Sequence, residues 1–322
     1  MLYKKVTFGT AVELWRKKAE FNGFSPKTVR NTEAFVKMLG QFVPLETSLG
    51  RFSVKDYERA IGKMRVSKYA PETIMDLNAT MRKLLNLAVK KQLVRENILA
   101  RADNLRMGER REARVIPREH FRKILAGTEQ EKYRFLFTLL YYAGLRIGEA
   151  LALTPRDFMK EGGIWRVKIS KSYLHEFKLV KSTKNGKVRE IPLSPKVFGE
   201  FLRMNRARSE NAQIFDFSPQ AARAILRKIC DEAGVPRYRL HEFRHTFVSN
   251  LMRGGVPLPV VAQMAGDTQA TVLKRYSHAF LDDEQLVLRA LCASDHAAQP
   301  ERYGAQKRLC CFCREHHGVY HE

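Results

Sequence analysis

The chain has 322 residues and a mass of 37.2 kDa, which is long enough for two domains that each have a hydrophobic core. Lysine and arginine outnumber aspartate and glutamate by 58 to 34, and the net charge of +24 favours a polyanionic partner, nucleic acid before an acidic membrane surface. No segment reaches the roughly 20 apolar residues of a membrane-spanning helix. Five cysteines, three of them in CCFC near the end, do not form a disulfide framework. We expect a soluble intracellular protein.

The first hundred residues carry repeated signals for the start of a helix. Thr10-Ala11-Val12-Glu13 has the composition of a capping box, Ser25-Pro26 combines an N-cap with proline, and Ser53-Val54-Lys55-Asp56 offers another start. From Pro71 onward, apolar residues recur at helical spacing with basic residues between them. The apolar positions are Ile74, Leu77, Met81, Leu84, Leu85 and Ala88. We expect a small helical domain with a basic face over residues 1–106.

The stretch MGERREARVIP, residues 107–117, loses the apolar periodicity and ends in proline, so we expect an interdomain linker there. Helices are expected over 118–126 and across 132–153. In 165–169, Trp, Val and Ile alternate with Arg and Lys, a pattern that predicts a half-buried strand.

Further along, Asn185-Gly186 lies between two short strand-like runs and is typical of a type I′ hairpin turn. Helices are expected to resume at Ser218-Pro219 and to continue toward the end of the chain. The second half is therefore mixed, with a small β component among helices.

The pentapeptide HEFRH, residues 241–245, has two incompatible interpretations. As H-E-x-x-H it matches a zinc protease signature, but that site needs a third protein ligand and a free glutamate. Val248 and Leu251 stand where the extended zinc pattern has glycine and a further histidine. Read as H-x-x-R-H, the pentapeptide instead contributes Arg244 to phosphate chemistry, and histidines that only fill a helix face are the third alternative.

Phosphoryl transfer requires cations on the non-bridging oxygens, a nucleophile in line, and groups that exchange protons with the entering and leaving oxygens. The second half offers such a set in the order Arg146, Lys184, His241, Arg244 and Tyr276. Three of them have a plainer alternative: an intrahelical ion pair for Arg146, a solvated side chain beside a turn for Lys184, and a half-buried helical residue for Tyr276.

These residues stand in motifs that resemble the tyrosine recombinases of the phage integrase family. The family's G-L-R-x-x-E-x-L box is Gly144-Leu145-Arg146-Ile147-Gly148-Glu149-Ala150-Leu151. Its hairpin lysine before an I-P-L strand matches Lys184 in TKNGKVREIPL, and its H-x-L-R-H-T box is HEFRHT. The closing box is AGDTQATVLKRYSH, which places the nucleophile at Tyr276. The order and spacing agree from about residue 110 to 290.

The resemblance implies a mainly α fold with a small β-sheet: a helical core-binding domain over 1–106 and an α+β catalytic domain over 118–296. It further implies site-specific DNA recombination without metal, ATP or other cofactor, on double-stranded attachment sites of a mobile element. A homotetramer on paired sites is expected, with an excisionase or a host DNA-bending protein as further partners and a cytoplasmic, nucleoid-associated location. The arm-site domain of larger integrases is expected to be absent or truncated.

The implied roles follow the residue chemistry. Tyr276 would attack a DNA phosphate to give a 3′-phosphotyrosyl bond, while Arg146 and Arg244 neutralise the developing charge. Lys184 would protonate the leaving 5′ oxygen, and His241 would act on the tyrosine proton, because a free tyrosine has a pKa near 10.

One residue of the set departs from the family pattern: Asp267 stands where the family usually has histidine. An ionised carboxylate cannot donate a hydrogen bond to phosphate, so we expect it to accept from Arg244 or His241, with direct catalysis as the alternative. Glu149 is expected to have a similar supporting role. His245 and His278 match the family pattern, but the sequence assigns them no role.

Residues 282–291 predict an amphipathic helix, which would dock on a neighbouring protomer or pack on its own domain. Residues 297–322 form a Cys- and His-containing tail that we expect to be disordered, with zinc binding as the alternative. The alternative function is a DNA-binding protein on the same fold without catalysis, and a topoisomerase-like enzyme would share the chemistry.

Overall fold

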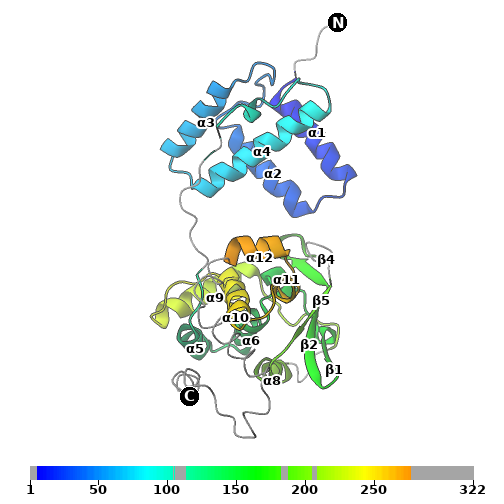
Figure 1. The fold of residues 1–322 in the computed structure, drawn as a ribbon, viewed down its shortest axis with the longest axis vertical. Helices are drawn as coiled ribbons and strands as arrows, with labels where there is room; N and C mark the ends of the chain where they lie inside the picture. The colour runs from blue at the N-terminus through cyan, green and yellow to red at the C-terminus, as the bar shows by residue number, and fades with distance from the viewer. Residues whose placement is uncertain (1–5, 104, 106–113, 183–187, 205–208, 277–322) are drawn as a thin grey trace, which may run out of the picture. The chain divides into compact units, whose positions relative to one another are not determined.

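The computed structural model describes residues 6–103, 105, 114–182, 188–204 and 209–276. The chain forms two compact units, Met1–Glu112 and Ala113–Glu322, each with its own hydrophobic core (Figure 1). No helix in the described ranges is long and apolar enough to cross a membrane. The predicted mainly α fold with a small β component is confirmed.

The first unit is helical. Its elements are α1 (Phe8–Phe21), α2 (Pro26–Leu39), α3 (Val54–Val66), α4 (Pro71–Lys90) and a 3-10 turn at Ile98–Ala100. Two of the predicted starts are confirmed, because Ser25 caps α2 and Ser53 forms a capping box with Asp56. The apolar face predicted for α4 is buried along its whole length and packs against α1 and α2.

The predicted start of α1 is wrong by three residues. Thr7 is the N-cap, and Thr10 closes its capping box from the third helical position instead of opening one. The helix begins earlier because Phe8 is fully buried and packs edge-to-face on Phe52 with ring centroids 4.9 Å apart.

The second unit surrounds α6, a helix that is buried on most sides, with further helices and two small sheets. Its helices are α5 (Arg118–Ala126), α6 (Glu131–Ala143), α7 (Ile147–Leu151), α8 (Pro195–Met204), α9 (Pro219–Glu232), α10 (Leu240–Arg253), α11 (Leu258–Ala265) and α12 (Gln269–Tyr276). Its strands are β1 (Phe158–Glu161), β2 (Ile164–Ile169), β3 (Lys171–Leu174), β4 (Leu179–Ser182) and β5 (Arg189–Pro192). The antiparallel sheets have the orders β1-β2-β5 and β3-β4.

The two strands that flank Asn185-Gly186 do not pair with each other as the hairpin prediction implied. β5 pairs with β2, and β4 pairs with β3. The reason is burial: Ile191 of β5 lies opposite Val167 of β2 in the core, whereas β4 exposes its apolar side chains. Residues 183–187, which include Lys184, lie outside the described residues.

Helix α8 has no counterpart among the sequence predictions. It begins at Pro195, directly after Ser194, and the same Ser-Pro signal marks α2 and α9, so that signal identifies it in retrospect. Phe201 of α8 stacks on Phe158 of β1 with centroids 4.0 Å apart, which covers one end of the sheet.

The predicted linker ends too late. Ile116 is buried, and its N–H donates to the Thr246 hydroxyl of α10 at 2.8 Å. Arg114 donates to the Glu242 carboxylate at 3.0 Å. Residues 114–117 therefore pack on the second unit, because an apolar side chain and a backbone N–H find partners there. The tail over 297–322 and the helix expected at 282–291 lie outside the described residues.

The helix expected across 132–153 breaks at Gly144. This residue ends α6 in the left-handed conformation, with φ of 61°, and a Cβ there would overlap the Phe247 ring of α10. The break turns the chain so that Leu145 enters the core and Arg146 becomes the N-cap residue of α7.

Gly144→Ala should therefore destabilise the second unit by about 2–5 kcal/mol, the sum of a left-handed alanine and a forced contact with Phe247. The measurement is urea-induced unfolding. Gly199→Ala is the control, because Gly199 lies within α8 and an added methyl group would meet no atom within 4 Å, so this variant should gain about 0.5–1 kcal/mol. Equal effects of the two changes would contradict the role assigned to Gly144.

Candidate active site

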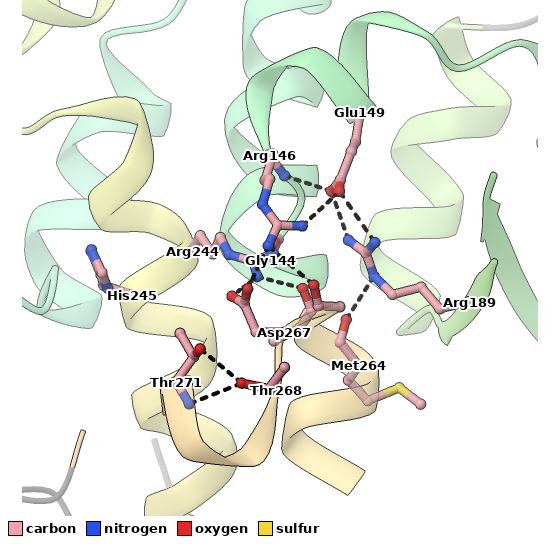
Figure 2. A network of polar contacts seen from close by, with 12 residues as sticks. Gly144, Arg146, Glu149, Arg189, Arg244, His245, Met264, Asp267, Thr268 and Thr271 are labelled. Atoms are coloured by element: carbon pink, nitrogen blue, oxygen red, sulfur yellow. Dashed lines mark hydrogen bonds and ion pairs between the residues drawn. The ribbon is translucent and has the colours of Figure 1, made fainter. Parts of the chain in front are cut away.

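Charged side chains from four segments of the second unit meet at one point (Figure 2). Arg146 and Glu149 belong to α7, and Arg244 projects from the second turn of α10. Arg189 begins β5, and Asp267 follows the glycine that ends α11. Residues separated by more than a hundred positions in the chain are thereby brought within hydrogen-bond distance of each other.

Arg146 contacts two carboxylates. Its Nη1 donates to Glu149 at 2.9 Å, and its Nη2 donates to Asp267 at 2.7 Å and to the Gly266 carbonyl at 3.1 Å. The intrahelical pair that was the plainer alternative for this arginine does exist. It is part of a larger set, however, because the same guanidinium reaches the segment after α11.

Arg244 is almost completely buried, with 2% of its side chain exposed. Its Nη1 donates to the Gly144 carbonyl at 2.8 Å, and its Nη2 donates to Asp267 at 2.6 Å and to the Ala265 carbonyl. Burial is the main cause that lowers the pKa of Arg244, with Arg146 adding to it, while Asp267 opposes the shift. A guanidinium stays protonated at neutral pH, so the site holds a desolvated cation.

The residue that sequence reasoning missed is Arg189. Its guanidinium forms a bidentate pair with Glu149 at 3.2 and 2.6 Å, and its Nε donates to the Met264 carbonyl at 2.9 Å. Both side chains of the pair are at most 3% exposed. The signal was present in the strand pattern, because Arg189 alternates with Ile191 on the inward face and a buried arginine needs an acid partner.

The pair with Arg189 keeps Glu149 ionised. Burial is the largest influence on this carboxyl and acts to raise its pKa, but the hydrogen bonds and charge of Arg189, with Arg146, outweigh it and lower the pKa. The glycine at 266 belongs to the same arrangement, since a Cβ there would lie 2.6 Å from the Arg189 guanidinium.

The structure places His245, and not His241, beside the tyrosine. The Nδ1 atom of His245 and the Tyr276 hydroxyl form a hydrogen bond, and the two histidine rings lie one helical turn apart with centroids 4.6 Å from each other. The assignment of the tyrosine proton to His241 is therefore corrected for this structure. The last residue of α12 lies beside the second turn of α10, where His245 stands.

The two histidines and the tyrosine are all held in their neutral forms. Burial is the main cause that lowers the pKa of His241 and His245 to about 4, and nearby arginine charges add to it. Burial raises the pKa of Tyr276 to about 12, although Arg244 and Arg275 act in the opposite direction. A neutral imidazole can accept a proton, so His245 is placed to act as a base on the phenol.

The glutamate of HEFRH is engaged elsewhere. Glu242 accepts the Arg239 N–H at 2.6 Å, which caps α10, and it pairs with Arg114 at 3.0 Å. Within the described ranges, no group of three or more histidine, cysteine, aspartate or glutamate side chains could hold a metal ion.

A basic groove with a volume of about 830 Å³ adjoins the site at His241. Arg223 and Arg227 of α9 and Arg239 line it, over a floor that includes Leu226 and Leu240. Polyanions are the ligands that such a rim of guanidinium groups attracts.

The sequence model of the Phage integrase family matches residues 114–282. The chain belongs to the phage integrase family. It is 27% identical to tyrosine recombinase XerC of Pelobacter propionicus over 169 residues, which are 48% of this chain, and the match spans about half (51%) of that relative. It is 22% identical to tyrosine recombinase XerA of Pyrococcus horikoshii over 237 residues, covering 70% of this chain and 75% of that protein.

Two solved structures share the fold. The Tn1549 transposon integrase in complex with transposon right end DNA superposes with a TM-score of 0.72 at 16% identity, covering 87% of this chain and 99% of that chain. A lambda integrase dimer bound to a COC′ core site gives a TM-score of 0.66 at 14% identity, covering 87% of this chain and 80% of that chain.

Replacing Arg189 by methionine should cost about 3–5 kcal/mol of unfolding free energy, because Glu149 would lose its bidentate partner while remaining buried. Arg237→Met is the matched control. It removes an equally bidentate pair with Asp231, but both side chains are largely exposed and screened by solvent, so the unfolding free energy should hardly change. Similar losses in urea unfolding would show that the buried pair does not stabilise this unit.

Proposed function

We propose that this protein is a site-specific recombinase that cleaves and rejoins DNA through a 3′-phosphotyrosyl bond at Tyr276, integrating or excising a mobile element. One observation carries the proposal: the Tyr276 hydroxyl is hydrogen-bonded to a neutral histidine on the helix that also carries Arg244. A nucleophile, its base and a phosphate-binding cation thus come from neighbouring positions of a rigid scaffold.

In the proposed chemical step, one bond to phosphorus forms as another breaks, and each proton that moves has an acceptor. The Tyr276 oxygen attacks phosphorus as its proton passes to His245, and the bond from phosphorus to the 5′ oxygen breaks. Arg146 and Arg244 stabilise the charge on the phosphorane oxygens. Lys184 protonates the leaving oxygen, a role that rests on the sequence motif. A 5′-hydroxyl of the partner strand reverses the step, so that no ATP is consumed.

DNA is the proposed partner because of charge. The net charge of +24 and the arginine rim of the groove beside His241 both fit a sugar-phosphate backbone. A lambda integrase tetramer has been seen bound to a Holliday junction, and we propose a homotetramer on paired sites here, with one protomer at each cleavage point. An excisionase or a host DNA-bending protein would complete that assembly.

A DNA-binding protein without catalysis is the second candidate, and Asp267 favours it, since the carboxylate replaces the histidine that the family usually has. The two candidates differ at Tyr276, which a pure DNA-binding protein does not need.

Tyr276→Phe should abolish covalent capture of a nicked suicide substrate while DNA binding persists, because only the attacking oxygen is removed. The test uses denaturing gels for capture and mobility shifts for binding. Tyr238→Phe is the matched control, since it also removes a buried hydroxyl that is bonded to a histidine Nδ1, that of His120, at 2.6 Å. Capture that survives the change at Tyr276, or is lost equally at Tyr238, would count against the assignment.

The second-order rate constant of capture, measured with DNA below saturation, should stay nearly constant as the pH falls from about 7 to about 5. The folded protein lowers the pKa of His245 to about 4, so the neutral base persists well below the 6.5 of an ordinary histidine and is lost only near pH 4. His245→Gln should bind DNA and be slower by about 10²–10⁴. A midpoint near pH 6.5 in the second-order rate constant, which reports the protein before DNA binds, would contradict this environment.

A further inference from the structure

The turn after α11 supplies acceptors to both catalytic arginines. The carbonyls of Ala265 and Gly266 accept from Arg244 and Arg146 respectively, and the Asp267 carboxylate gives one oxygen to each. Gly266 is left-handed, with φ of 64°, and the Asp267 N–H is fixed on the Ala262 carbonyl at 3.0 Å. The carboxylate is therefore presented from a fixed backbone between the two guanidinium groups (Figure 2).

The hydrogen atoms on the two arginines can be counted. Each Nη2 carries two, and each Nη2 has two acceptors in this turn, one carbonyl and one carboxylate oxygen. Each Nη1 donates once, that of Arg146 to Glu149 and that of Arg244 to Gly144. What remains for a phosphate is the Nε–H and one Nη1–H of each arginine, judged from the bonds of the described residues.

We propose that Asp267 is a positioning residue for the recombination chemistry: it ties the Nη2 atoms of Arg146 and Arg244 together, so that their other donors face the scissile phosphate. This inference rests on the proposed function. Asp267 itself touches the arginines and not the phosphate. A guanidinium displaced by about 1 Å can slow a reaction by about 10²-fold, so rigid placement of both has a measurable effect.

Charge explains why a carboxylate suits this place. Arg146, Arg189 and Arg244 contribute three positive charges, and Glu149 and Asp267 contribute two negative charges, which leaves +1 for the phosphate. A histidine could accept from only one of the two Nη2 atoms, and a protonated histidine would repel both arginines. Where the family usually has a residue that donates a hydrogen bond to phosphate, this chain has a carboxylate that accepts hydrogen bonds from two guanidinium groups.

Asp267→Asn is the primary test, because it keeps the shape but offers one acceptor oxygen and turns an N–H₂ group toward an arginine donor. The readouts are the maximal single-turnover rate of capture and the dissociation constant for the same suicide substrate. The maximal rate should fall by about 10²-fold, while binding stays unchanged or tightens, since a negative charge near DNA has been removed.

Asp231→Asn is the matched control. It removes the same charge from an exposed pair with Arg237, beside the groove, and should leave the maximal rate unchanged. Asp267→Glu retains two acceptor oxygens and should recover more of the rate than the Asn variant. Asp267→His, which restores the residue that the family usually has, should remain slow.

A variant with Asn or His at 267 that cleaves as fast as the wild type, or faster, would overturn the proposal and show that the carboxylate competes with phosphate. Loss of DNA binding and a lowered unfolding temperature in all three variants would also overturn it, because Asp267 would then be a determinant of folding. Failure of the wild type to capture DNA that it binds would count against the proposed function instead, and the two failures are therefore distinguishable.

Discussion

The buried ion pair between Arg189 and Glu149 is the constraint on which the site depends. Two charges that are almost fully withdrawn from water are tolerable only with good geometry and no unused acceptor, and Glu149 meets this condition by accepting four hydrogen bonds. The pair joins β5 to α7, and through Arg146 and Asp267 it reaches α10. Arg244 is thus linked to Arg189 of β5 through Glu149, Arg146 and Asp267.

Two left-handed glycines make this arrangement sterically feasible. Gly144 leaves space for Phe247, and its carbonyl accepts from Arg244; Gly266 leaves space for Arg189, and its carbonyl accepts from Arg146. Each glycine therefore ends a helix and also brings a backbone acceptor to an arginine. The network is built as much from helix ends as from side chains: Arg146 donates to one backbone carbonyl, that of Gly266, and Arg244 donates to two, those of Gly144 and Ala265.

Local chemistry made the starts of α2 and α3, the inward face of β2 and the four motifs readable from the sequence, and the family and the fold followed from them. Three features could not be read in this way. The pairing of β5 with β2 is decided by burial at long range, the contact of His245 depends on where α12 ends, and the bridge made by Asp267 requires two arginines that lie far apart in the chain. Each is a tertiary relation that no local pattern contains.

In the proposed mechanism, the resting site holds the nucleophile Tyr276 in its protonated form. With the pKa of His245 near 4 and that of Tyr276 near 12, the shared proton belongs to the tyrosine by a wide margin. Besides burial, it is the positive charge of Arg275 and Arg244 that lowers the pKa of His245. A phosphate bound to the arginines offsets that charge and makes His245 a stronger base. In that mechanism the same phosphate disfavours a free phenolate, so we propose that proton transfer and formation of the bond to phosphorus proceed together. The proposed nucleophile is then reactive only where DNA is bound.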